Sequence, residues 1–92
     1  MSSTAVTKKN RTILGTAVRI ILGNGNRPLA PEDIAVRGVQ TGSLRIPRGR
    51  TRGYLSQLLQ STLYDDAHYA KWPLVRRVAT GLYKAKARAI GR

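Results

Sequence analysis

The sequence predicts a small α+β domain, mainly α-helical, in which a β-hairpin follows three helices. Three observations predict it: the chain has only 92 residues, apolar residues recur at helical spacing in three stretches, and two short β-type runs around a glycine turn come last. A chain of this length supports one domain with a small core. We expect the domain over 11–87, after a flexible basic arm (1–10) and before a basic tail (88–92).

The first two helices are predicted from their apolar spacing and from their end signals. Between residues 11 and 23, apolar residues recur along one side of a helix. The run Gly23–Asn26 ends this helix because glycine and asparagine tolerate left-handed backbone. The second helix begins at Pro31, since proline suits the first helical position. Glu32 and Asp33 favour the same start because acids are stabilised at a helix N-terminus. Thr41–Gly42 ends this helix.

The third helix is predicted to begin near Thr51, a good N-cap, and to run to about Tyr64. One side is apolar because leucines recur along it at helical spacing. The opposite side is polar and carries no charge, while arginines gather at the approach to the helix and in its first turn. No element is predicted for the residues that follow, 65–72.

A β-hairpin is predicted at the end of the domain, with strands at 74–78 and 82–86. The three-residue loop between them ends in a glycine, which is typical of a bulged hairpin. Leu29 is extended beside a proline and supplies a third strand. Aromatic residues near the hairpin, Tyr69, Trp72 and Tyr83, are expected in the core. The rest of the predicted core is Ile13, Leu14, Val18, Ile21, Ile34, Leu55, Leu58, Leu59, Val78 and Leu82.

The composition argues against an enzyme. The four acidic residues form two adjacent pairs, Glu32–Asp33 and Asp65–Asp66, and neighbours on a helix point about 100° apart, so neither pair converges as acid and base. His68 is the single histidine and there is no cysteine. Metal sites and nucleophilic triads therefore lack their ligands and bases. We expect no cofactor, no metal and no small-molecule substrate.

The net charge predicts a polyanionic partner. Seventeen Lys and Arg against four Asp and Glu give a formal charge of +13, and self-repulsion of this size is relieved by a neutralising surface. No apolar run approaches the ~20 residues of a membrane span. The polar N-terminus has no signal-peptide pattern, and the absence of cysteine fits a reducing interior. We expect a cytoplasmic or nuclear location, on a nucleoid or on chromatin.

The element order is that of a winged helix-turn-helix, which places its third helix in the major groove of DNA and its hairpin, the wing, on the adjacent backbone. Eleven basic residues lie from Arg45 onward and six precede it, so the charge gathers in the half that this fold presents to DNA. The predicted contacts of the third helix and its approach are Arg48, Arg50, Thr51, Arg52, Gly53, Tyr54, Ser56, Gln57 and Gln60. Those of the wing are Arg76, Arg77, Thr80 and Lys84.

Three segments resemble the HARE-HTH family of winged helices. Residues 28–34 (PLAPEDI) are similar to the opening of that family's second helix, 52–59 (RGYLSQLL) to its third helix, and 75–83 (VRRVATGLY) to its wing. The wing differs in having Ala79 and Thr80 where the family often has Gly-Pro. The resemblance covers about 12–86. It implies a DNA-binding winged helix of the kind found attached to chromatin, transcription and restriction proteins and linked to sensing of cytosine methylation.

Two other functions fit the same charge. One is an RNA-binding protein of the small ribosomal type, although the aromatic content is only 5% and no strand carries a pair of stacking aromatics. The other is an interaction module that docks on an acidic protein. The sequence leaves open whether DNA binding is sequence-specific, whether methylated DNA is preferred, and whether the chain forms a homodimer or joins a larger partner.

Overall fold

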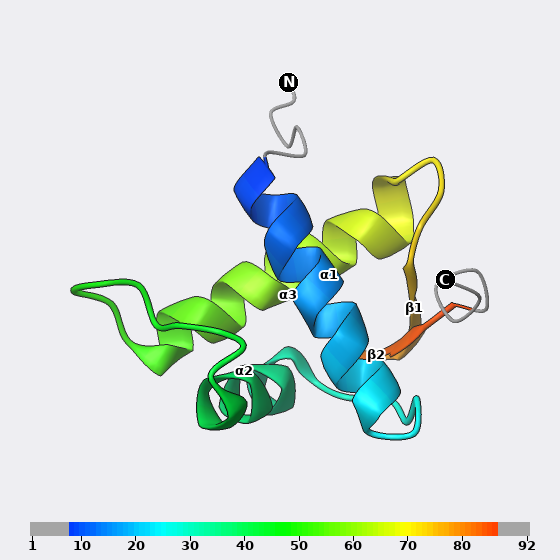
Figure 1. Cartoon of the computed structure of the whole chain (residues 1–92). Helices are drawn as coiled ribbons and strands as arrows, with labels where there is room; N and C mark the ends of the chain where they lie inside the picture. The colour runs from blue at the N-terminus through cyan, green and yellow to red at the C-terminus, as the bar shows by residue number, and fades with distance from the viewer. Residues whose placement is uncertain (1–7, 87–92) are drawn as a thin grey trace.

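The structure, a computed structural model, describes residues 8–86 and confirms three helices followed by a hairpin (Figure 1). The elements are α1 (Lys8–Gly23), α2 (Pro31–Thr41), α3 (Arg52–Tyr69), β1 (Val75–Ala79) and β2 (Leu82–Ala85). Because α1 begins at Lys8, residues 8–10 belong to a helix and not to the predicted arm. The rest of that arm and the tail 88–92 lie outside the described residues. The order and the antiparallel hairpin are those of a winged helix.

Helix α2 has the bounds that its end signals predict. Pro31 is its first residue, Glu32 and Asp33 lie in its first turn, and Gly42 caps its end in the left-handed region with φ 80°. The Gly42 N–H donates to the carbonyl of Val39 over 3.2 Å. Local sequence therefore determines both ends of this helix.

Helix α3 extends to Tyr69, beyond the predicted end at Tyr64. The inward-facing stripe of leucines continues for one more turn, but its next buried member is the carboxylate of Asp66. Asp66 Oδ2 accepts hydrogen bonds from the backbone N–H groups of Leu74 (2.8 Å) and Val75 (3.0 Å). No element was predicted for this segment from the sequence, whereas in the structure Asp66 ties α3 to the start of β1.

The hairpin register differs from the prediction at its turn. Val75 pairs with Ala85 and Arg77 with Tyr83, and after a bulge Ala79 pairs with Leu82, so the turn itself is Thr80–Gly81. The predicted bulge is thus present, and the loop is one residue shorter than predicted. The predicted third strand is also present as a single bridge, in which Leu29 and Tyr83 exchange two backbone hydrogen bonds of 2.9 and 3.0 Å.

The core lies where α1 crosses α3 and where both meet α2 and the hairpin (Figure 1). Leu82 is 36% exposed and is not a core residue, because alternation along β2 turns Tyr83 and Ala85 inward instead. Leu58 and Val78 are only half-buried, as are Ile13 and Leu14, which pack on the core from α1. The buried apolar residues are Ala17, Val18, Ile21, Leu29, Ile34, Ala35, Leu44, Leu55, Leu59, Leu63, Val75, Tyr83 and Ala85.

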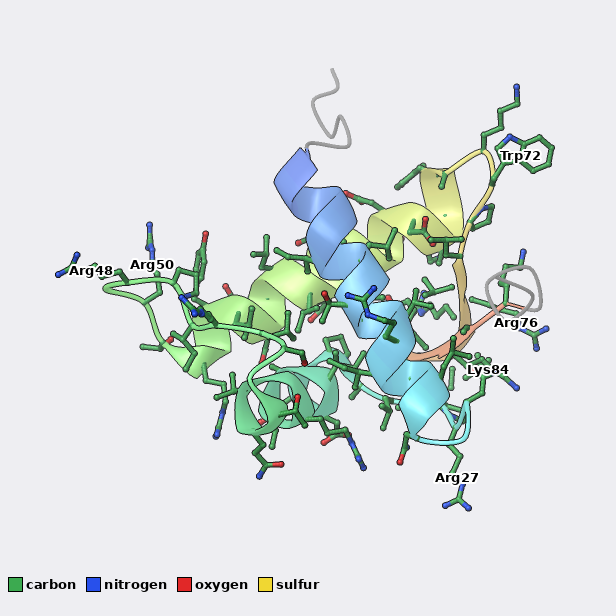
Figure 2. The ribbon with its side chains drawn as sticks, viewed as in Figure 1. Arg27, Arg48, Arg50, Trp72, Arg76 and Lys84 are labelled. Carbon is green, nitrogen blue, oxygen red and sulfur yellow. The ribbon has the colours of Figure 1, made fainter. Side chains whose placement is uncertain are left out.

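The expectation for the aromatic residues is wrong for two of three. Tyr83 is buried, and burial raises the pKa of its phenol. Trp72 is 64% exposed and Tyr69 is 74% exposed. Both lie where α3 gives way to the connection into β1, outside the crossing of the helices, and Figure 2 shows Trp72 projecting from this connection.

Replacing Gly38 by alanine is expected to destabilise the fold by about 1–3 kcal/mol, because it overpacks a tight contact. A Cβ at this buried position of α2 would lie 2.8 Å from the Cβ of Leu44. Gly15→Ala in α1 is the matched control, since nothing lies within 4 Å of its added carbon, and an alanine stabilises a helix interior relative to glycine. Urea denaturation of both variants measures the difference, and equal stabilities would contradict the tight contact.

Candidate nucleic-acid interface

The outward side of α3 presents a row of uncharged residues along its length. Gly53, Gln57, Gln60, Ser61 and Tyr64 are all exposed at helical spacing, and we call them the polar stripe. An open groove of about 520 Å³ lies on this side. It is lined by four residues of the stripe and by one acid: Gln57, Gln60, Ser61, Tyr64 and Asp65. Amide and hydroxyl groups both donate and accept hydrogen bonds, so the stripe suits a partner with mixed polar edges.

Four arginines gather at the N-terminal end of this stripe. The connector between α2 and α3 holds three of them and α3 begins with the fourth; together they form the arginine loop, Arg45, Arg48, Arg50 and Arg52. All four are exposed, and Figure 2 shows Arg48 and Arg50 projecting from one end of the molecule.

The arginine loop is positioned by contacts at its start and by a hydrogen-bonded turn within it. At its start the buried Leu44 packs on Gly38, and its N–H donates to the Gly38 carbonyl over 3.0 Å. Within it, Gly49 is left-handed with φ 77°, and the Arg50 N–H donates to the carbonyl of Pro47 over 2.9 Å. These bonds close a tight turn, so the fold determines where the arginines project.

Thr51 and Tyr54 join the arginine loop to the helix. Thr51 is the N-cap as predicted, and its Oγ1 accepts from the Tyr54 N–H over 3.2 Å. Its side chain therefore caps the helix, and Thr51 is also exposed between Arg50 and Arg52. The Arg50 guanidinium lies 4.6 Å from the centre of the Tyr54 ring, a cation–π contact.

The hairpin register divides the basic residues of the wing between two faces. Arg77 pairs with Tyr83 on the face that turns toward α3, and its guanidinium lies 5.9 Å from the ring centre of Tyr64. Arg76 and Lys84 pair with each other on the opposite face. Figure 2 shows these two at the other end of the molecule from Arg48 and Arg50.

The predicted contact residues thus fall into one continuous surface and one separate group. The polar stripe joins the arginine loop at one end and Arg77 at the other, whereas Arg76 and Lys84 lie on the far side of the hairpin and Thr80 lies at its tip. Ten of the predicted contacts are exposed, namely Arg48, Arg50, Thr51, Arg52, Gly53, Gln57, Gln60, Arg76, Arg77 and Thr80. Tyr54, Ser56 and Lys84 are half-buried.

Little acidic charge offsets these arginines. After residue 44 the chain has two acids, Asp65 and Asp66, and Asp66 is buried against the backbone of β1. Burial raises the pKa of the Asp66 carboxyl, although the N–H groups of Val75 and Leu74 and the charge of Lys86 act in the opposite direction. Asp65, half-buried beside the polar stripe, is the acid of this half that lies at the groove.

An aromatic cluster at the C-terminal end of α3 was missed by sequence reasoning. The rings of Tyr64 and His68 stack with centres 4.0 Å apart and planes 20° apart, and Tyr69 lies 6.3 Å from each of them. His68 Nδ1 also lies 2.9 Å from the Tyr64 carbonyl oxygen. The i, i+4 spacing of Tyr64 and His68 is the signal that could have found this cluster, had α3 been extended through it.

Within residues 8–86 no group of three or more His, Asp or Glu side chains is placed to hold a metal ion. Over the same residues, none of the helices combines the length and the apolar character needed to cross a membrane. Comparison with protein-family models, with curated protein sequences and with solved structures finds no match to this chain.

Proposed function

We propose that this chain is a double-stranded DNA-binding winged helix and not an enzyme. One observation carries the proposal: an exposed row of uncharged residues on α3, most of them with hydrogen-bonding side chains, has exposed arginines at both ends. DNA presents the complementary pattern, because the base edges in the major groove donate and accept hydrogen bonds while phosphates flank the groove.

The dimensions of the elements suit this arrangement. A helix with its side chains is about 10–12 Å across, close to the ~12 Å width of the major groove. In the proposed complex the polar stripe faces the base edges, where Gln57 and Gln60 offer the amide geometry that pairs with adenine. The arginine loop and Arg77 bind phosphates on the two sides of the groove. The Cα extents of 35 × 34 × 25 Å match about one turn of duplex.

The likeness to the HARE-HTH family belongs to this proposal and extends it to modified DNA. Such a function implies a compartment that holds DNA, either a nucleoid or a nucleus with chromatin. Selection from a random duplex library, with and without 5-methylcytosine, is the experiment that assigns the specificity. Enrichment of one motif indicates a sequence reader, and enrichment only in the methylated library indicates a modification reader.

Arg77→Ala is expected to weaken duplex binding more than Arg76→Ala does. The two variants lose the same charge from neighbouring positions of β1, but only Arg77 faces α3. Each phosphate contact contributes about 0.9 to the slope of log K against log salt concentration. Fluorescence anisotropy at several salt concentrations should therefore show a shallower slope for Arg77→Ala and a nearly unchanged one for Arg76→Ala.

Two results would count against the proposal. Equal slopes for both variants would mean that the duplex does not lie along α3 as proposed. Preference for folded RNA over duplex DNA, in a competition at one ionic strength, would favour the RNA-binding alternative instead.

A further inference from the structure

The aromatic cluster at the end of α3 is open to solvent. Tyr69 is 74% exposed and Tyr64 is 38% exposed, while His68, stacked on Tyr64, is exposed as well. Exposed aromatic rings that touch one another form a contiguous apolar surface, and such surfaces on small proteins mark binding sites. These rings are not part of the buried core, to which α3 contributes Leu55, Leu59 and Leu63.

One basic side chain lies beside a ring of this cluster, and a second lies beside Trp72 in the connection that follows α3. The Arg77 guanidinium is 5.9 Å from the centre of the Tyr64 ring, and Lys71 Nζ is 6.0 Å from the centre of the Trp72 ring in the connection that follows α3. Trp72 is itself 64% exposed. Stacking surfaces next to cations are what single-stranded nucleic acids bind, because every base has a π-face and every linkage carries a phosphate.

The cluster is also continuous with the surface proposed to bind duplex. Tyr64 belongs both to the groove lined by Gln57 and Gln60 and to the stack with His68. A duplex lying along the polar stripe therefore ends, at the C-terminal side of α3, against the rings. Tyr69, which is 74% exposed, is open to a strand that leaves the duplex at this point.

We propose that the aromatic cluster Tyr64, His68 and Tyr69 stacks an unpaired base, so that the protein binds DNA best at a junction between duplex and single strand. The inference goes beyond binding of intact duplex and rests on that function only for the position of the duplex. The partner is recognised by its chemistry, which is an unstacked base followed by a phosphate that Arg77 can neutralise.

The test compares a blunt duplex with the same duplex carrying a short single-stranded thymidine tail. Wild-type protein should bind the tailed duplex about tenfold more tightly, the order expected for stacking of one or two bases. Tyr69→Leu should keep the blunt-duplex affinity and lose this gain, whereas Tyr69→Phe, which keeps the ring, should retain it.

The outcomes separate this inference from the duplex proposal. A tail that adds no affinity, or a gain that survives in Tyr69→Leu, would overturn it even if the blunt duplex is bound. If the blunt duplex is not bound, free oligothymidine takes the place of the tailed duplex, and ring-dependent binding of it would still support the stacking site. If neither the tailed duplex nor oligothymidine is bound through Tyr69, and an acidic protein is bound there instead, the rings belong to a protein partner and the inference is overturned.

Discussion

Replacing Asp66 by alanine is expected to lower the free energy of unfolding by about 2–4 kcal/mol and to loosen the hairpin from α3. The variant leaves the buried N–H groups of Leu74 and Val75 without the acceptor that they have in the wild type, at 2.8 and 3.0 Å. Unsatisfied buried donors are costly because they lose hydrogen bonds to water as well. Urea denaturation measures the loss, and amide hydrogen exchange at Leu74 and Val75 locates it.

Asp66→Asn is the matched control, because it keeps an acceptor oxygen and removes the charge. Asp66→Asn should therefore keep most of the stability that Asp66→Ala loses. Equal losses in the two variants would mean that the charge, and not the hydrogen bonding, holds the hairpin.

The raised pKa of Asp66 predicts that the free energy of unfolding depends on pH. Burial raises the pKa of Asp66 above its ordinary value of 3.8, so the folded protein holds this proton more tightly than the unfolded chain does. Protonation of Asp66 therefore adds a stability increment that is full below pH 3.8 and is lost as the pH rises through the folded-state pKa, while the hydrogen bonds that Asp66 accepts from Leu74 and Val75 do not depend on this proton. Denaturation from below this value to neutral pH should show that decline in the wild type, relative to Asp66→Asn.

Neutralising three residues of the arginine loop is expected to weaken duplex binding on the order of a hundredfold at low salt. Arg48, Arg50 and Arg52 are exposed at the start of α3, so their replacement by alanine removes phosphate contacts without opening the core. The salt slope should fall by about 0.9 for each contact that is lost. Anisotropy titrations with a fluorescent duplex measure both quantities.

The control triple removes the same charge elsewhere. Arg19, Arg27 and Arg37 are exposed on α1, on the turn after it and on α2, and Figure 2 shows Arg27 far from Arg48 and Arg50. Either triple takes the formal net charge from +13 to +10, three charges lower. If net charge alone drives binding, the two triples lose affinity equally, and the assignment of the interface to α3 is wrong.

Sequence patterns predicted the elements whose limits depend on local chemistry. Helix α2 begins at its proline and ends at its glycine as expected, and Thr51 caps α3. The last turn of α3 could not be predicted in this way, because what stabilises it is the bond from Asp66 to a strand eight and nine residues away. A buried carboxylate has no apolar signature in the sequence.

The candidate site was predicted in its residue types but not in its arrangement. The arginines and glutamines are exposed where the helix pattern places them. The division of Arg76 from Arg77 follows from the hairpin register, and alternation along β2 places Leu82 on the outer face. Tyr69 and Trp72 were predicted in the core because they lie beside the hairpin in the sequence, but the structure leaves both exposed at the end of α3 and in the connection that follows it.

The amide of Asn26 has a consequence for how the chain behaves at high concentration. Asn26 Oδ1 accepts from the Ala85 N–H over 2.9 Å, and its Nδ2 donates to the Ala85 carbonyl over 3.3 Å, so one side chain acts as an extra strand residue beside the Leu29 bridge. The β2 edge is therefore closed to strand addition by another molecule. A second copy would have to pair along β1, where Arg76 and Arg77 would face arginines of the other chain. The sheet thus resists edge-to-edge association of hairpins between copies of the chain.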